Sequence, residues 1–234
     1  AVHMPEAEID EMIGELLRAQ SNPTFALLAR PGYVAVRVTA KGADEEETMA
    51  LIEKTAGEIE KRMPVSRYHL EGDVLHDLHE FLLKEGLTVS AAESCTGGLI
   101  GKFLTDNPGS SSYFKGSAVT YWNETKEKVL SVKKEDLDQF TAVSAPVAEE
   151  MAEGSRSLYG SDIAVSTTAY AGPGKGERGE EAGLVYIGIA GSWGTEVHRE
   201  QFFGSRRSVR YGAAEKALYY LLQYGKKVKL GKNG

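Results

Sequence analysis

The chain has 234 residues, of which 41% are hydrophobic and 26% charged, as expected for an ordinary globular protein with one large domain or two smaller ones. A net charge of −7 argues against a surface built as a whole for nucleic acid or anionic membrane. No segment approaches the ~20 consecutive apolar residues of a membrane span, and we expect no secretory signal. Cys95 is the only cysteine, which excludes an intrachain disulfide and favours a reducing compartment, by default the cytoplasm.

Residues 1–66 are predicted to form a small α+β domain. Apolar residues recur at helical spacing from Ile9 to Leu17, and the alternating stretch Tyr33–Thr39 predicts a strand with one buried face. A second helix begins after Asp44 and ends at Pro64, while Arg30-Pro31-Gly32 is expected to form a turn.

Residues 67–234 predict a layered α/β/α domain with a mixed sheet, because helical and strand patterns alternate along this part of the chain. The expected helices are Asp73–Lys84, Thr96–Leu104, Asn123–Leu130, Ser144–Tyr159 and Ser205–Tyr224. The expected strands are Thr88–Ala91, Phe114–Tyr121, Ile163–Thr168, Leu184–Ala190 and Glu196–Phe203, the last two paired as an antiparallel hairpin. The lysine-rich segment after Tyr224 is expected to be disordered.

Ser94 is the centre of the most informative stretch. It follows a buried strand and precedes a predicted helix start, where unpaired N–H groups and the helix dipole favour negative charge. The backbone N–H groups of Thr96, Gly97 and Gly98 are therefore candidate oxyanion donors. Two alternatives remain open: Ser94 is only a helix cap, or the adjacent Cys95 is the nucleophile.

A serine nucleophile needs a base, and none of the five histidines shares a motif with Ser94. Lys126 is the alternative, since it lies in the first turns of the helix after the next strand and a desolvated lysine can approach neutrality. Tyr121, at the end of that strand, could orient Lys126 or contact substrate. A solvated lysine and a tyrosine covering the rim of the sheet are the plain alternatives.

Two further stretches could complete a site. Arg206 and Arg210 lie four residues apart at the start of the last predicted helix, which suits a phosphate, although a solvated arginine face would give the same pattern. The loop containing Gly172 and Gly174 predicts a flexible wall, but it fits neither a P-loop nor a dinucleotide fingerprint. No spacing of His, Cys and acidic residues predicts a metal site, and no cofactor is expected.

Four motifs in order resemble the C-terminal domain of the CinA family, the nicotinamide-nucleotide amidohydrolase or NMN deamidase domain. They are Ala92-Glu93-Ser94-Cys95-Thr96-Gly97-Gly98, Pro108-Gly109-Ser110-Ser111, Val119-Thr120-Tyr121-Trp122-Asn123-Glu124-Thr125-Lys126 and Ala171-Gly172-Pro173-Gly174. Residues 1–64 resemble the small KH-type connecting domain of that family. The family's N-terminal molybdopterin-binding-like domain has no counterpart in these residues.

The resemblance implies hydrolysis of nicotinamide mononucleotide to nicotinic acid mononucleotide and ammonia, with Ser94 as nucleophile, Lys126 as base and Tyr121 beside them. It also suggests a homo-oligomer, with a dimer as the simplest form. Trp122 and Lys175 depart from the family pattern and could alter the pocket. A non-catalytic nucleotide-binding or scaffold module is therefore the alternative. The small domain lacks the Gly-x-x-Gly clamp that binds nucleic acid, so we do not expect it to bind RNA.

Overall fold

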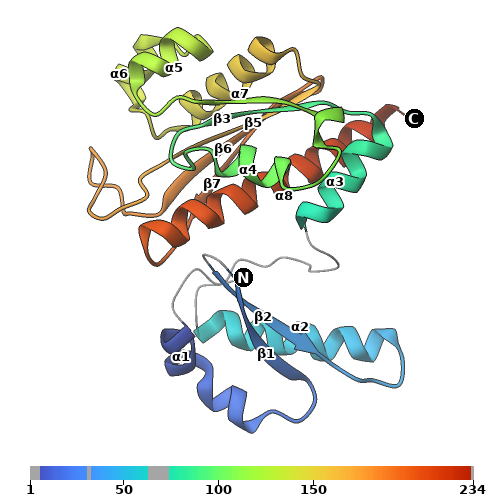
Figure 1. Cartoon of the computed structure of the whole chain (residues 1–234). Coiled ribbons are helices and arrows are strands. Elements are labelled where there is room, and N and C mark those ends of the chain that lie inside the picture. Colours follow the sequence, from blue (N-terminus) through green and yellow to red (C-terminus); the bar gives the residue numbers. More distant parts are fainter. Residues whose placement is uncertain (1–5, 31–32, 63–73, 233–234) are drawn as a thin grey trace.

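The computed structural model describes residues 6–30, 33–62 and 74–232, which form two units, each with its own core (Figure 1). The smaller unit consists of α1 (Glu6–Ala19), β1 (Thr24–Arg30), β2 (Tyr33–Thr39) and α2 (Glu45–Arg62). β1 and β2 pair antiparallel, and their inward residues pack with Ile9, Ile13 and Ile59. The small α+β unit is thus confirmed. The predicted turn at 31–32, the end of the helix at Pro64 and the boundary at 66/67 lie outside the described residues.

The larger unit contains a five-stranded mixed sheet in the order β4-β3-β5-β6-β7. Its strands are β3 (Val89–Glu93), β4 (Phe114–Val119), β5 (Ile163–Ala169), β6 (Leu184–Gly191) and β7 (Gly194–Gln201). Its helices are α3 (Val74–Glu85), α4 (Leu99–Thr105), α5 (Asn123–Leu130), α6 (Lys134–Phe140), α7 (Ala145–Tyr159) and α8 (Arg206–Lys232), with a short 3₁₀ turn at Ser110–Ser112.

Strand direction places three strand ends together. β3 is parallel to both β4 and β5, whereas β6 and β7 form an antiparallel hairpin that continues the sheet from β5. The carboxyl ends of β3, β4 and β5 therefore lie at one edge, the usual position of a site in such sheets.

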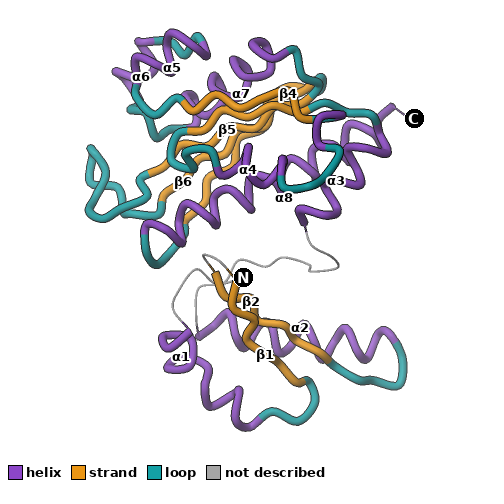
Figure 2. The backbone as a smooth tube through the Cα atoms, viewed as in Figure 1, coloured by secondary structure: helices purple, strands orange, loops and turns teal. Residues whose placement is uncertain are grey.

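Helices cover both faces of the sheet, which confirms the predicted layered α/β/α arrangement (Figure 2). Alternate residues of β3 belong to different cores: Ala91 packs with residues of α3, α4 and α8, and Ala92 packs with residues of α5, α6 and α7. The side of the sheet on which a β3 residue lies thus determines which helices it can meet.

The structure differs from the sequence predictions at several places. β3 extends to Glu93 and α4 begins only at Leu99, because Gly98, with φ 99°, lies outside helical geometry. The charged segment Lys134–Phe140 forms a helix that the sequence pattern does not reveal, since only Leu137 of it is buried. The segment after Tyr224 is not disordered, because α8 continues to Lys232. Lysines suit the negative end of a helix, and Lys227 also pairs with Glu196 at 3.1 Å.

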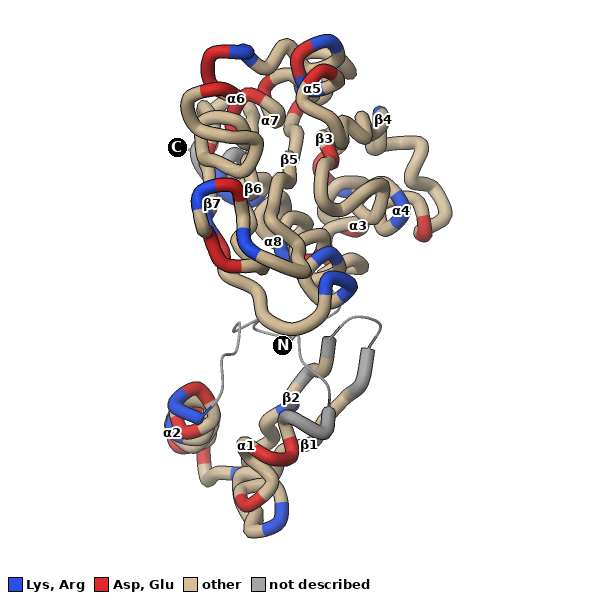
Figure 3. Tube along the Cα trace, turned by 90° about the vertical axis from the view of Figure 1, so that its left-hand side faces the viewer, with Lys and Arg blue, Asp and Glu red and all other residues tan. Residues whose placement is uncertain are grey.

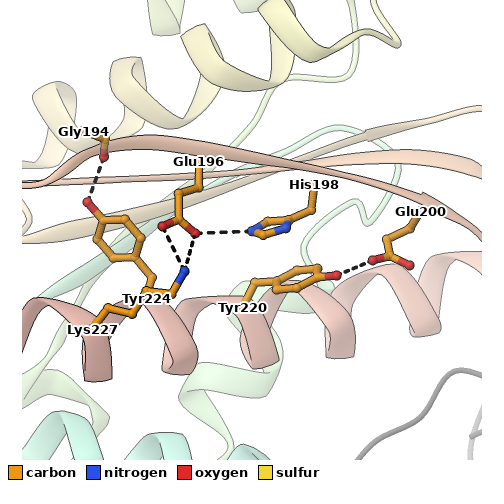
Figure 4. A network of polar contacts seen from close by, with 7 residues as sticks. All are labelled: Gly194, Glu196, His198, Glu200, Tyr220, Tyr224 and Lys227. Carbon is orange, nitrogen blue, oxygen red and sulfur yellow. Dashed lines mark hydrogen bonds and ion pairs between the residues drawn. The ribbon is translucent and has the colours of Figure 1, made fainter.

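A network of polar contacts joins α8 to the edge strand β7 (Figure 4). The His198 ring stacks on Tyr220, with centroids 3.7 Å apart, and its Nε2 lies 3.7 Å from Glu196. The Tyr224 hydroxyl donates to the Gly194 carbonyl at 2.8 Å. Burial lowers the pKa of His198, against the opposing effect of Glu196 and Glu200. These contacts fix α8 along the sheet and, with it, the arginines at its first turns.

Candidate active site

Four segments far apart in the sequence meet at the edge where β3, β4 and β5 end. Arg206 of α8 donates to the Tyr121 hydroxyl at 2.6 Å and to the Gly172 carbonyl at 2.7 Å. Arg210, one turn later, donates from Nε to the Cys95 carbonyl and from Nη2 to the Thr96 carbonyl, both at 2.8 Å. The helix thus links the turn after β3 to the segments that follow β4 and β5.

Ser94 is half-buried and continues the sheet, since its N–H donates to the Thr167 carbonyl at 3.0 Å. The next two residues are buried, and the Thr96 hydroxyl is hydrogen-bonded to that of Thr167 at 2.8 Å. Ser94 makes no capping bond to α4, whose N-cap is Gly98. The helix-cap alternative for Ser94 is therefore wrong.

The side chain that does occupy the start of α4 is Glu93, which is fully buried. Its carboxylate accepts the N–H groups of Gly98 at 2.7 Å, Ile100 at 3.1 Å and Gly101 at 2.9 Å, and the Ser117 hydroxyl at 2.8 Å. The Gly98 N–H is thus already bonded to Glu93, which makes it a weaker candidate for an oxyanion donor than the N–H groups of Thr96 and Gly97. Sequence reasoning missed Glu93, although a charged residue directly after the apolar Ala91-Ala92 was a usable signal.

Lys126 lies in the first turn of α5 and is only 1% exposed. Its Nζ donates to the carbonyls of Thr120 at 3.0 Å and Tyr121 at 3.2 Å. Burial lowers the pKa of Lys126 to about 8, against an opposing effect of the nearby Cys95. No ion pair with Lys126 occurs within the described residues, so the amine can act as a base near neutral pH.

Cys95 is a poor candidate nucleophile. Its thiol is buried, and burial raises its pKa to about 12, so the thiolate is scarce at neutral pH. A hydrogen bond from Thr167 opposes this shift without reversing it. The alternative in which Cys95 attacks the substrate is disfavoured by its environment.

The rim of the site contains the more exposed residues. Tyr121 is 53% and Trp122 72% exposed, and Tyr121 reaches Arg206 through its hydroxyl. Lys175 pairs with Glu181 at 2.6 Å within the loop between β5 and β6. Gly174 is exposed, and nothing lies within 4 Å of where its Cβ would be. Of the two loop glycines predicted to bind substrate, Gly172 is therefore the one joined to the other predicted site residues.

One buried polar atom near Lys126 is unsatisfied. The Thr120 hydroxyl has no hydrogen-bond partner in the described part of the chain, although its carbonyl accepts the Lys126 amine. Buried polar groups are nearly always paired, and exceptions are often found at functional sites.

Within residues 6–30, 33–62 and 74–232, no group of three or more His, Cys, Asp or Glu side chains could hold a metal ion. None of the helices described there is long and apolar enough to cross a membrane.

The fold and the site define an α/β protein with a buried lysine and a serine turn at one sheet edge, joined to a small α+β domain. Residues 72–224 match the family model of the CinA C-terminal domain, and residues 1–68 match that of the damage-inducible protein CinA KH domain. The chain belongs to the CinA family.

Relatives named competence-damage inducible protein include one from Bacillus subtilis, 42% identical over 219 residues. That match covers 93% of this chain but 52% of the relative. A second relative, from Caldanaerobacter subterraneus, is 45% identical and matches 88% of this chain and 50% of its own length. The chain thus spans about half the length of the curated relatives it matches.

Solved structures of CinA-type proteins resemble the larger domain. A competence damage-inducible protein from Klebsiella pneumoniae is 33% identical, with a TM-score of 0.63, and the match covers 64% of this chain and 93% of that one. One from Agrobacterium tumefaciens is 34% identical, with a TM-score of 0.61, and the match covers 67% and 98% respectively.

Proposed function

We propose that this chain is an amidohydrolase that converts nicotinamide mononucleotide to nicotinic acid mononucleotide and ammonia. The observation that carries the proposal is Lys126, a buried lysine that has no acidic partner in the described part of the chain and whose pKa is lowered to about 8. A lysine kept partly neutral is the base that a serine nucleophile needs when no histidine is available.

The position of Ser94 directly after β3 supports its pairing with Lys126. Ser90 contacts Ser155 of α7, whereas Glu93 contacts the start of α4 on the opposite face. Cys95, the residue after Ser94, lies close enough to Lys126 to influence the pKa of that amine. Ala92, on the same face of β3 as Ser90, packs with residues of α5, α6 and α7. Lys126 lies on α5, on that same face.

The proposed reaction has two steps. Neutral Lys126 takes the proton of the Ser94 hydroxyl as its oxygen attacks the carboxamide carbon, and the protonated amine then gives a proton to the departing ammonia. The N–H groups of Thr96 and Gly97 stabilise the oxyanion. Water, deprotonated by Lys126, then attacks the resulting ester; the bond between the acyl carbon and the Ser94 oxygen breaks, Lys126 returns the proton to that oxygen, and the acid leaves. No cofactor takes part, and we assign the reaction to the cytoplasm.

Arg206 is the proposed phosphate ligand. Its guanidinium is exposed at the rim, and its hydrogen bonds within the described residues go to neutral oxygens, those of Tyr121 and Gly172. A phosphate dianion is a stronger acceptor for this planar group and would compete with both. The expected substrate is thus a nucleotide whose carboxamide reaches Ser94 while its phosphate lies at the rim.

The test measures ammonia release from nicotinamide mononucleotide by the intact chain, Ser94→Ala and Lys126→Met. Lys128→Met, an exposed lysine on the same helix, is the matched control. Both site variants should lose turnover by about 10³-fold or more, while the control keeps it. Near wild-type turnover in Ser94→Ala would refute the serine mechanism and make Cys95→Ala the next variant.

The second candidate is a nucleotide-binding or scaffold module without catalysis, with the small domain contacting partners. It is favoured by Trp122 and Lys175, although both lie at exposed positions. A thermal shift with nucleotide but no ammonia release from the intact chain would support it. A homodimer, the proposed assembly, is checked by light scattering of the same preparation.

A further inference from the structure

The turn that follows Ser94 is held from two sides by buried or half-buried charged groups. On one side, the carboxylate of Glu93 accepts N–H groups from the end of the turn and the start of α4. On the other, the guanidinium of Arg210 donates to the carbonyls of two consecutive residues, Cys95 and Thr96.

The contacts of Arg210 determine where two N–H groups point. The Cys95 carbonyl shares a planar peptide unit with the Thr96 N–H, and the Thr96 carbonyl shares one with the Gly97 N–H. Both units are trans, so each N–H points opposite to its carbonyl. Because both carbonyls point to Arg210 on α8, the two N–H groups point away from α8. These are the donors that remain for an oxyanion once Glu93 has taken the N–H of Gly98.

Gly97 allows this close approach. Its φ is +59°, in the left-handed region that favours glycine, and a Cβ there would lie 3.1 Å from Nη2 of Arg210. The guanidinium therefore rests directly on the turn. Arg206 has different contacts. It is exposed at the rim of the site and donates to Gly172 and Tyr121 rather than to the turn after Ser94.

We propose that Arg210 and Glu93 are positioning residues, which orient the Thr96 and Gly97 N–H groups as the oxyanion hole, and that Arg206 alone binds the phosphate. This inference rests on the proposed amidohydrolase function. The proposal gives different roles to Arg206 and Arg210, although their spacing on α8 would suggest that both bind one phosphate. It also gives Glu93 a role that the sequence pattern does not reveal. Removal of either positioning group should slow the chemical step and leave nucleotide affinity unchanged.

The experiment compares Arg210→Ala, Arg210→Lys and Glu93→Gln with Arg206→Ala. Turnover is measured as kcat for ammonia release from nicotinamide mononucleotide, and the Kd of the same nucleotide is measured by calorimetry with each change placed in Ser94→Ala. Arg210→Ala and Glu93→Gln should lower kcat by about 10²-fold, as expected when oxyanion donors are misplaced, with Kd within about twofold of the parent. Arg206→Ala should raise Kd by about tenfold or more.

Arg210→Lys keeps the charge but not the two-pronged donor, so it should restore only part of the loss in kcat. If Arg210→Ala does not fold, Arg210→Lys still tests the proposal. The midpoint of the pH profile should stay unchanged in Arg210→Lys, because the Lys126 amine keeps its own surroundings, whereas a variant that disturbs the whole site would move it.

Three outcomes would count against the proposal. If the intact chain releases no ammonia, the proposed function fails and this inference fails with it. If the intact chain is active and the Arg210 variants keep kcat within twofold, the positioning role is refuted while the function stands. An increase in Kd in Arg210→Ala as large as that in Arg206→Ala, with kcat unchanged, would instead assign Arg210 to the phosphate.

Discussion

At the scale of single residues, Lys126 shows how burial creates chemistry that an isolated lysine lacks. It lies on a short, mostly polar helix and would be solvated if that helix were alone. Packing of α5 against α7 and the strand ends removes its amine from water, while two carbonyls still accept its protons. The charged form loses hydration without gaining a carboxylate partner, so the pKa falls to about 8.

The pH profile of turnover should report this shift. The base is active only when neutral, so kcat/KM should rise by about tenfold per unit below pH 8 and level off above it. Near pH 7 only about a tenth of the molecules would have neutral Lys126. Initial rates of ammonia release between pH 6 and 9.5 would measure the profile. A rate independent of pH across this range, or one that falls as pH rises, would exclude Lys126 as the base.

The motif residues of the site could be named from sequence, but their contacts could not. The order of strands made it possible to expect that the segments after β3 and β4 meet, because parallel strands bring their carboxyl ends together. Glu93 was not found, because its role depends on the orphan N–H groups of a helix that starts three residues later than predicted. Arg206 and Arg210 have different contacts because of the way α8 packs against the turn after Ser94. The spacing of two arginines along one helix does not predict this packing.

At the scale of elements, α7 packs against α5 through a backbone contact at Gly154. An added Cβ at this position would lie 2.0 Å from the carbonyl oxygen of Leu130, which is the last residue of α5. Only glycine allows the two helices to approach so closely. Since α5 also contains Lys126, this contact helps to place the base. Sequence patterns predicted both helices, yet not the approach between them, because an isolated glycine in a helix gives no sign of what it faces.

Gly154→Ala should therefore destabilise the larger domain by roughly 1–3 kcal/mol, since the added methyl group overpacks a backbone contact. Turnover should fall as well, because displacement of α5 moves Lys126. Gly57→Ala in α2 is the control: no atom lies within 4 Å of the new Cβ, so alanine should raise stability by about 0.5–1 kcal/mol. Urea denaturation of both variants measures the difference, and equal effects on stability would contradict the proposed close approach.

At the scale of the whole molecule, the chain consists of two units with separate cores. Ile9, Ile13, Val34 and Ile59 form the core of the small unit, and none of its described residues belongs to the cores of the larger one. Acidic residues lie in the first turn of α2 and basic residues in its last turn, and acidic residues predominate along α1 (Figure 3). The solved relatives from Klebsiella and Agrobacterium match only about two thirds of this chain, yet nearly all of their own length.

The larger unit should therefore fold and function without the small one. All predicted site residues lie within it, and its apolar clusters are complete between α3 and α8. A chain of residues 70–234 should unfold cooperatively and release ammonia from nicotinamide mononucleotide within about twofold of the intact rate. Ile13→Ala in the intact chain, which opens a cavity in the small core, should likewise leave turnover unchanged while it costs the small unit about 2–5 kcal/mol. Loss of turnover in a folded 70–234 chain would show that the small unit completes the site, and the same loss in Ile13→Ala would identify its packed core as the part required.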